Sequence, residues 1–226
     1  MKRRTTRILL YIAVFIVGVI VLSPEHYKRA IVYGHVNIDD YKIFSNRLVQ
    51  NAEPLPWQHD TAYNTAKINP ALLDEFNRFG TTAFVVIHNK QILHEEYWDG
   101  GSDTTRSNSF SAAKSIVSLL IGCLIDEGKI KNTDQPVTDF IPGFKTNGFP
   151  LRIKDLLTMS SGTRFNEVGS VLYEDWRRAY LEASLKFEPG TAFEYNSMNS
   201  YMLAAALQRK TRMGVAEFLR PRLFEP

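Results

Sequence analysis

The chain has 226 residues, a 44% hydrophobic content and a formal net charge of +3, which is enough sequence for one sizeable folded core. Four Lys and Arg residues lie within residues 2–7, and no acidic residue precedes Glu25. The rest of the chain is therefore close to neutral, which argues against a basic nucleic-acid-binding surface. The only cysteine is Cys123, so an internal disulfide is excluded, but the compartment is not fixed by this count.

The N-terminal segment has the layout of a secretory signal or membrane anchor. Residues 8–22 read ILLYIAVFIVGVIVL without a charge, after the basic residues and before Ser23-Pro24. Because no small-x-small cleavage site follows, we expect residues 1–24 to anchor the protein in the bacterial cytoplasmic membrane, with the remainder on the periplasmic side. A cleaved signal and a buried N-terminal helix remain alternatives, since a membrane helix usually needs about 17–25 residues.

A linker and wrapping segment is expected over residues 25–80, where aromatic side chains are scattered and Pro54 and Pro56 interrupt any helix. Within it, a helix is predicted over 70–79. Two stretches rich in β-branched and aromatic residues follow, TAFVVIH at 82–88 and ILHEEY at 92–97. They predict a β-hairpin that turns at Asn89-Lys90-Gln91.

The second half of the chain is expected to be helical. Residues 111–125 carry apolar side chains at helical spacing and end before Gly128. Further helices are predicted over 153–159, 173–184 and 197–210, and from Val215 to a break at Pro221. Strands followed by helices, rather than alternating βαβ units, indicate an α+β fold, with residues 81–226 as the main domain.

Ser111 and Lys114 form a Ser-x-x-Lys pattern at the start of the first of these helices. Positions i and i+3 share one helix face, so the ammonium group is expected beside the hydroxyl. A serine hydroxyl becomes a good nucleophile when a neighbouring base takes its proton, and burial lowers the pKa of a lysine toward that role. The alternative is that Ser111 only caps the helix and that Lys114 is an exposed first-turn residue.

Four runs of the sequence resemble, in order, the β-lactamase-related serine hydrolases, which include class C β-lactamases, D,D-peptidases, family VIII esterases and 6-aminohexanoate-dimer hydrolases. The runs are SFSAAKSIVSLLIGCLIDEGKI (109–130), DQPVTDFIP (134–142), IKDLLTMSSG (153–162) and PGTAFEYNS (189–197). The resemblance covers residues 82–226. It implies an α/β sandwich, in which an antiparallel sheet flanked by helices carries a helical lobe.

The resemblance also implies that the sheet is completed by strands after the helical lobe. We therefore expect those C-terminal strands, with a Lys- or His-Thr/Ser-Gly motif, to lie beyond Pro226 and to be missing from this chain.

Site roles follow from the same resemblance. Ser111 would be the acylated nucleophile, Lys114 would share its proton, and Tyr195 matches the tyrosine that acts as the general-base partner. The asparagine expected two residues after the tyrosine is replaced by Ser197, and Asn196 lies one place early. This departure favours the 6-aminohexanoate-dimer hydrolase and esterase branch over penicillin chemistry.

Two aromatic residues of the lobe, Tyr173 and Trp176, are further candidates, because family members line the substrate cleft with such side chains. Asn196 and Ser197 are expected to contact substrate as well.

The predicted function is hydrolysis of small-molecule amides, esters or peptides through an acyl-serine. The alternatives are β-lactamase or D,D-peptidase activity on penicillins or peptidoglycan, and a non-catalytic envelope protein that uses the fold for binding. The five histidines show no metal-ligand spacing, and no cofactor motif is present. No cofactor, no metal and no nucleic-acid partner are therefore expected.

Overall fold

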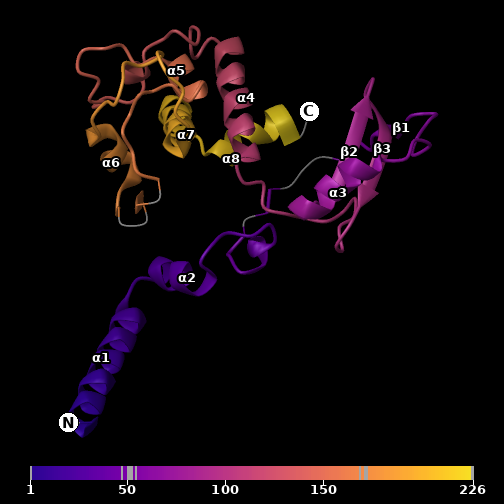
Figure 1. Ribbon diagram of the computed structural model, residues 1–226. Coiled ribbons are helices and arrows are strands. Elements are labelled where there is room, and N and C mark those ends of the chain that lie inside the picture. Colours follow the sequence, from indigo (N-terminus) through magenta and orange to yellow (C-terminus); the bar gives the residue numbers. More distant parts are fainter. Residues whose placement is uncertain are drawn as a thin grey trace. The chain divides into compact units, whose positions relative to one another are not determined.

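The computed structural model describes residues 2–46, 48–49, 53, 55–167, 169–170 and 173–224. These residues form two compact units, shown together in Figure 1. One comprises Met1–Asn37 and Ser109–Leu223, and the other Ile38–Asn108 and Phe224–Pro226. The boundaries predicted from the sequence, after residues 24 and 80, remain predictions.

The N-terminal segment is helical. Helix α1 spans Lys2–Leu22 and contains the apolar run, and the short helix α2 follows over Glu25–Tyr33. Among the residues whose side chains the structure describes, no helix has both the length and the apolar character needed to cross a membrane. The membrane anchor therefore stays a prediction.

The smaller unit contains a three-stranded sheet in the order β1-β3-β2. Strands β2 (Ala83–His88) and β3 (Gln91–Tyr97) form the predicted antiparallel hairpin, and its turn residues Asn89 and Lys90 both have positive φ, 49° and 63°. Strand β1 (Gln58–His59) pairs in parallel with β3 and was not predicted. No sequence pattern could predict this strand, because two residues are too few to show the alternation of apolar and polar side chains.

Helix α3 (Pro70–Phe79) confirms the helix predicted over 70–79, and local sequence explains both of its ends. The Asn69 side chain accepts a hydrogen bond from Ala71 N at 2.9 Å, while Gly80 ends the helix with a φ of 61°. Phe76 packs its ring against those of Phe84 and Trp98, with centroids 4.8 and 5.6 Å apart. The helix thus covers the hairpin through an aromatic cluster.

Besides α1 and α2, the larger unit contains a helical lobe that begins after residue 108. Its elements are α4 (Ala112–Asp126), a 3₁₀ turn at Val137–Asp139, α5 (Ile153–Leu157), α6 (Trp176–Glu182), α7 (Ser197–Thr211), α8 (Val215–Leu219) and a π-helical turn at Arg220–Phe224. Every helix predicted for this region is present, although the second and third are shorter than expected. Helix α7 is central, because α4, α5, α6 and α8 all contact it (Figure 1).

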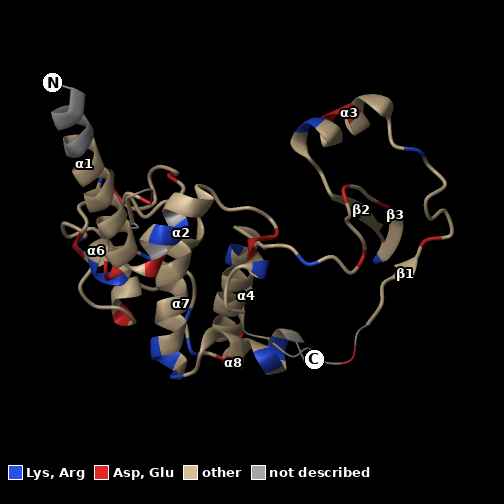
Figure 2. Cartoon of the chain, turned by 90° about the horizontal axis from the view of Figure 1, so that it is seen from below, with Lys and Arg blue, Asp and Glu red and all other residues tan. Residues whose placement is uncertain are grey.

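The core of the lobe lies along α7. Its fully buried apolar side chains include Leu120, Leu124, Leu156, Tyr180, Met202, Leu203, Leu207 and Phe218. The buried Tyr180 hydroxyl has hydrogen-bond partners within the core. It donates to Ser161 Oγ at 3.0 Å and is hydrogen-bonded to the buried side chain of Asn199. Arg209 and Lys210 occupy the last turn of α7 (Figure 2), where positive charge complements the helix dipole.

Candidate active site

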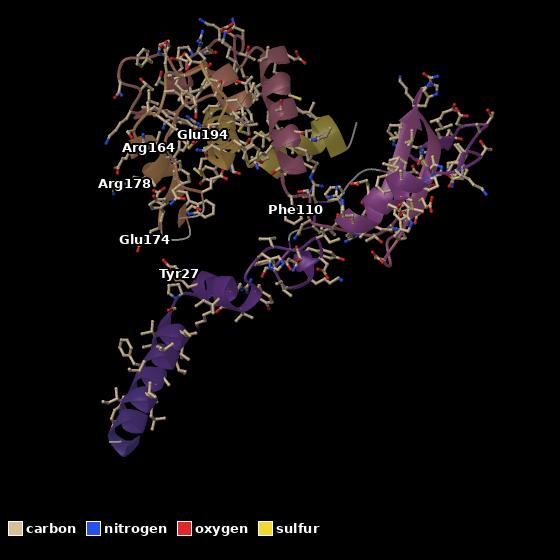
Figure 3. All side chains as sticks on the ribbon, in the orientation of Figure 1. Tyr27, Phe110, Arg164, Glu174, Arg178 and Glu194 are labelled. Atoms are coloured by element: carbon tan, nitrogen blue, oxygen red, sulfur yellow. The ribbon has the colours of Figure 1, made fainter. Side chains whose placement is uncertain are left out.

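Ser111 lies at the N-terminus of α4, immediately after a strained residue. Phe110, labelled in Figure 3 at the start of this helix, has a φ of 42°, which is uncommon for a residue with a side chain. Ser111 itself has helical backbone angles, φ −72° and ψ −8°, and its hydroxyl makes no capping hydrogen bond. The reading of Ser111 as an ordinary N-cap is therefore not supported, and its hydroxyl is available to other partners.

Those partners are Lys114 and Tyr195. The Lys114 Nζ donates a hydrogen bond to Ser111 Oγ at 2.9 Å, as the i, i+3 spacing predicts, and Tyr195 Oη lies 2.5 Å from the same oxygen. Lys114 Nζ is also 5.0 Å from the centroid of the Tyr195 ring. One hydroxyl oxygen thus lies between an ammonium donor and a phenol, although Ser111 and Tyr195 are 84 residues apart.

The environment of Tyr195 favours its ionised form. Hydrogen bonding from Lys114, and then from Ser111 and Ser197, holds the pKa of Tyr195 below its usual value of 10.0, while partial burial opposes this shift. The positive charge of Lys114 acts in the same direction. A phenolate at this position can accept the Ser111 proton, which is the property that a general base requires.

Three backbone hydrogen bonds bring Tyr195 to this position by joining residues 186–194 to the turn that follows α5. The donors and acceptors are Glu194 N to Met159 O at 2.8 Å, Gly190 N to Ser160 O at 2.8 Å, and Lys186 N to Gly162 O at 2.7 Å. Two of the sequence runs that carry the family resemblance, 153–162 and 189–197, are therefore direct neighbours in space.

Gly162 makes this close approach possible. Its φ is +71°, and a Cβ atom at this residue would lie 2.1 Å from the backbone oxygen of Phe187. Any larger residue would push the two segments apart, so glycine is required here for both conformation and space.

The start of α4 also offers a donor for negative charge. Within the described part of the chain, the backbone N–H of Ser111 has no hydrogen-bond acceptor. It belongs to the unsatisfied N–H groups of a helix N-terminus, which favour an anion. A carbonyl oxygen that gains charge during attack by Ser111 Oγ could be stabilised there.

The two residues after Tyr195 differ in their surroundings. Asn196 is only 4% exposed, and its side-chain oxygen accepts a hydrogen bond from Met198 N at 2.9 Å, which makes it the N-cap of α7. This placement favours a structural role over the substrate contact predicted for Asn196. Ser197 is half-buried, and its side chain contributes to the lowered pKa of Tyr195.

Glu167 was not identified from the sequence. Its carboxylate accepts a hydrogen bond from the backbone N–H of Ser197, 30 residues further along the chain. No local pattern indicates this contact, because Glu167 lies in a loop and its partner is a backbone group.

The two aromatic candidates contact residues of the lobe. Tyr173 packs on Phe165, with ring centroids 5.6 Å apart, and Trp176 Nε1 donates to Ser170 O at 2.8 Å. Tyr173 lines a cavity of about 560 Å³. The charged residues around this cavity are Arg164, Glu174, Asp175, Arg178 and Glu182, of which Arg164, Glu174 and Arg178 are labelled in Figure 3. A substrate contact for Tyr173 or Trp176 stays a prediction.

Comparison with solved structures shows the fold. A Bacillus anthracis protein named as a 6-aminohexanoate-dimer hydrolase is 21% identical, with a TM-score of 0.63 over 78% of this chain and 54% of its own. A β-lactamase/D-alanine carboxypeptidase from Yersinia pestis is 22% identical, with a TM-score of 0.51 over 69% of this chain and 53% of its own. The fold is therefore β-lactamase/transpeptidase-like, as predicted.

Sequence comparison points to the same group. A 6-aminohexanoate-dimer hydrolase from Paenarthrobacter ureafaciens is 28% identical over 170 residues, which are 66% of this chain and 43% of that protein. The chain thus spans about half of the length of the two solved structures and 43% of the length of the Paenarthrobacter ureafaciens protein. A family model described as Beta-lactamase matches residues 70–226, a region that contains Ser111, Lys114 and Tyr195. The chain belongs to the β-lactamase family.

Proposed function

We propose that this chain carries the nucleophile of a serine hydrolase that cleaves amide or ester bonds through an acyl-serine intermediate. The observation that carries the proposal is the position of Ser111 Oγ, 2.9 Å from Lys114 Nζ and 2.5 Å from Tyr195 Oη. The lowered pKa of Tyr195 supports it, because a lower pKa makes the phenolate, which is the base form, more readily available.

The proposed acylation step uses these three side chains. The Tyr195 phenolate takes the proton of Ser111, whose Oγ attacks the substrate carbonyl carbon, while Lys114 stabilises the phenolate by its charge. The oxyanion that forms is held by the Ser111 N–H at the start of α4. Tyr195 then gives the proton to the departing amine or alcohol, and a water molecule repeats the sequence to release the acid.

The similarity to two proteins named as 6-aminohexanoate-dimer hydrolases favours linear amides and esters as substrates. Ser197 supports this choice, since it occupies the position where the resemblance predicts an asparagine in β-lactamases. Activity on penicillins or on peptidoglycan peptides is the second candidate, favoured by the similarity to the Yersinia pestis protein.

Ester turnover tests the proposed activity. Wild-type protein should hydrolyse p-nitrophenyl acetate, and Ser111→Ala should reduce the rate to the uncatalysed level. Ser115→Ala is the matched control, because Ser115 is an exposed serine one turn further along α4, and it should leave the rate unchanged. Equal rates above the uncatalysed level would refute Ser111 as the nucleophile, whereas rates at the uncatalysed level for both proteins would favour a non-catalytic binding protein.

We further propose that the apolar run of α1 holds the protein in the cytoplasmic membrane, with the lobe on the periplasmic side. The basic flank and the uninterrupted apolar segment of residues 8–22 motivate this proposal. Fractionation after expression should recover the protein, with its N-terminus intact, in detergent-extracted membranes. A soluble protein with an intact N-terminus would contradict it.

A further inference from the structure

The first turn of α7 is completed by a residue from a distant loop. Of its N–H groups, that of Met198 donates to the Asn196 side chain at 2.9 Å and that of Asn199 to Asn196 O at 3.1 Å. The remaining group, the N–H of Ser197, donates to the carboxylate of Glu167. A carboxylate is well suited to this place, because it both accepts the hydrogen bond and complements the positive end of the helix dipole.

Two hydrogen bonds connect Glu167 to Ser170 and Ser170 to Trp176. Ser170 Oγ donates to Glu167 O at 2.6 Å, and Ser170 O accepts the indole N–H of Trp176 at 2.8 Å. Glu167 is therefore connected to the first residue of α6 on one side and to α7 on the other. Its half-buried position limits the competition of water for the hydrogen bond to Ser197.

Ser197 connects this contact to the reacting groups. Ser197 follows Tyr195 by only two residues and its side chain helps to hold the pKa of Tyr195 down, while Tyr195 Oη lies 2.5 Å from Ser111 Oγ. Movement of the Ser197 backbone would therefore change the geometry at Tyr195 Oη, although Glu167 itself has no recorded contact with Ser111 or Lys114 among the described residues.

We propose that Glu167 is a positioning residue, which fixes the segment from Tyr195 to Ser197 through its hydrogen bond to the Ser197 N–H. This proposal rests on the proposed function for its kinetic consequence, but the structural part concerns this segment alone. Glu167→Ala removes both the acceptor and the charge. Glu167→Gln removes the charge and keeps an oxygen that can accept the same hydrogen bond.

The two variants distinguish two effects of Glu167 on Tyr195, the effect of its hydrogen bond to Ser197 and the effect of its negative charge. Loss of a nearby negative charge lowers the pKa of a tyrosine, whereas displacement of the Ser197 side chain, which helps to hold the pKa of Tyr195 down, raises it. Both variants lose the negative charge of Glu167, so a difference between their Tyr195 pKa values reports only the hydrogen bond from the Ser197 N–H to residue 167. We expect a higher Tyr195 pKa in Glu167→Ala than in Glu167→Gln. Lys114 on α4 is unchanged in both variants, and Glu194, the adjacent acidic residue, remains paired with Lys186 at 2.6 Å.

The test combines NMR with kinetics on the full chain. In Glu167→Ala the amide of Ser197 should exchange faster with solvent, and kcat for p-nitrophenyl acetate should fall about tenfold, the effect of losing one hydrogen bond to a charged group. Glu167→Gln should stay within about threefold of wild type in both measurements. Glu188→Ala is the control, because Glu188 is an exposed carboxylate seven residues before Tyr195, and it should match wild type.

Unchanged Ser197 exchange in Glu167→Ala, or equal Tyr195 pKa values in the two Glu167 variants, would overturn the proposal. A lower melting temperature with unchanged kcat would also overturn it, since that result indicates a purely structural contact. If the wild type does not hydrolyse the ester, the proposed function fails, but amide exchange at Ser197 and the titration of Tyr195 still decide whether Glu167 positions the segment from Tyr195 to Ser197.

Discussion

Replacing Tyr195 by Phe removes one oxygen atom and tests the assignment of the general base. Tyr195 is 48% exposed and its ring makes no close aromatic pair among the described residues, so the variant leaves no buried cavity. We expect its stability to change by no more than about 0.5 kcal/mol, the usual limit for surface substitutions. The catalytic effect should be much larger, because the missing oxygen is the one that lies 2.5 Å from Ser111 Oγ.

Loss of a general base slows a reaction by about 10²–10⁴-fold, which corresponds to about 3–5 kcal/mol of transition-state stabilisation. The rate of Ser111 acylation by a fluorophosphonate should fall by this factor in Tyr195→Phe. Tyr201→Phe provides a matched control, since Tyr201 lies on α7 and is 47% exposed. A Tyr195→Phe variant that reacts within about threefold of wild type, well under that range, would refute the role of Tyr195.

Three further predictions concern the pH dependence of acylation, the stability of a Gly162 variant and the preference between esters and cephalosporins. The acylation rate should rise with pH along a limb whose apparent pKa lies below 10, because the base form of Tyr195 is favoured, and a pH–rate profile of Tyr195→Phe should lack this limb. Gly162→Ala should lower the free energy of unfolding by about 2–4 kcal/mol in denaturant titrations, since φ is +71° and Cβ meets Phe187 O. Hydrolysis of p-nitrophenyl esters should exceed that of cephalosporins in spectrophotometric assays, because Ser197 replaces the asparagine of β-lactamases.

Each of these predictions has a result that contradicts it. A flat pH–rate profile, or a limb that survives in Tyr195→Phe, would exclude Tyr195 as the titrating base. For the glycine, the control is Gly122→Ala, an exposed helical position with nothing within 4 Å of the added Cβ, which should stabilise by about 0.5–1 kcal/mol. Destabilisation by both variants would contradict the steric argument. Faster hydrolysis of cephalosporins would favour the β-lactamase branch.

The features that the sequence predicts well depend on residues close together in the chain. Helix α3 has its N-cap, Asn69, and its terminating Gly80 within the same stretch. Lys114 is placed beside Ser111 by one helical turn. The position of Tyr195 could be inferred only from the family resemblance, because it depends on backbone hydrogen bonds between residues 159–162 and 186–194.

The structure differs from the sequence-based predictions where contacts between distant parts of the chain decide the outcome. Strand β1 exists because Gln58 and His59 pair with β3, more than 30 residues away. Leu119 belongs to the predicted apolar stripe of the helix at 111–125 but is 55% exposed, whereas the neighbouring Leu120 is fully buried. Periodicity identifies an apolar face, but the packing partner decides which of its residues are covered. The bond from Ser197 N to Glu167 also lies beyond local patterns.

The most direct test of Ser111 as the nucleophile is to identify the residue that a fluorophosphonate modifies. Wild-type protein should be treated with a fluorophosphonate, digested and analysed by mass spectrometry, and the account predicts a single adduct on the peptide that contains Ser111. The same treatment of Ser111→Ala should give no adduct. An adduct on another serine, or none on the folded wild-type protein, would contradict the central claim that Ser111, activated by Lys114 and Tyr195, is the nucleophile.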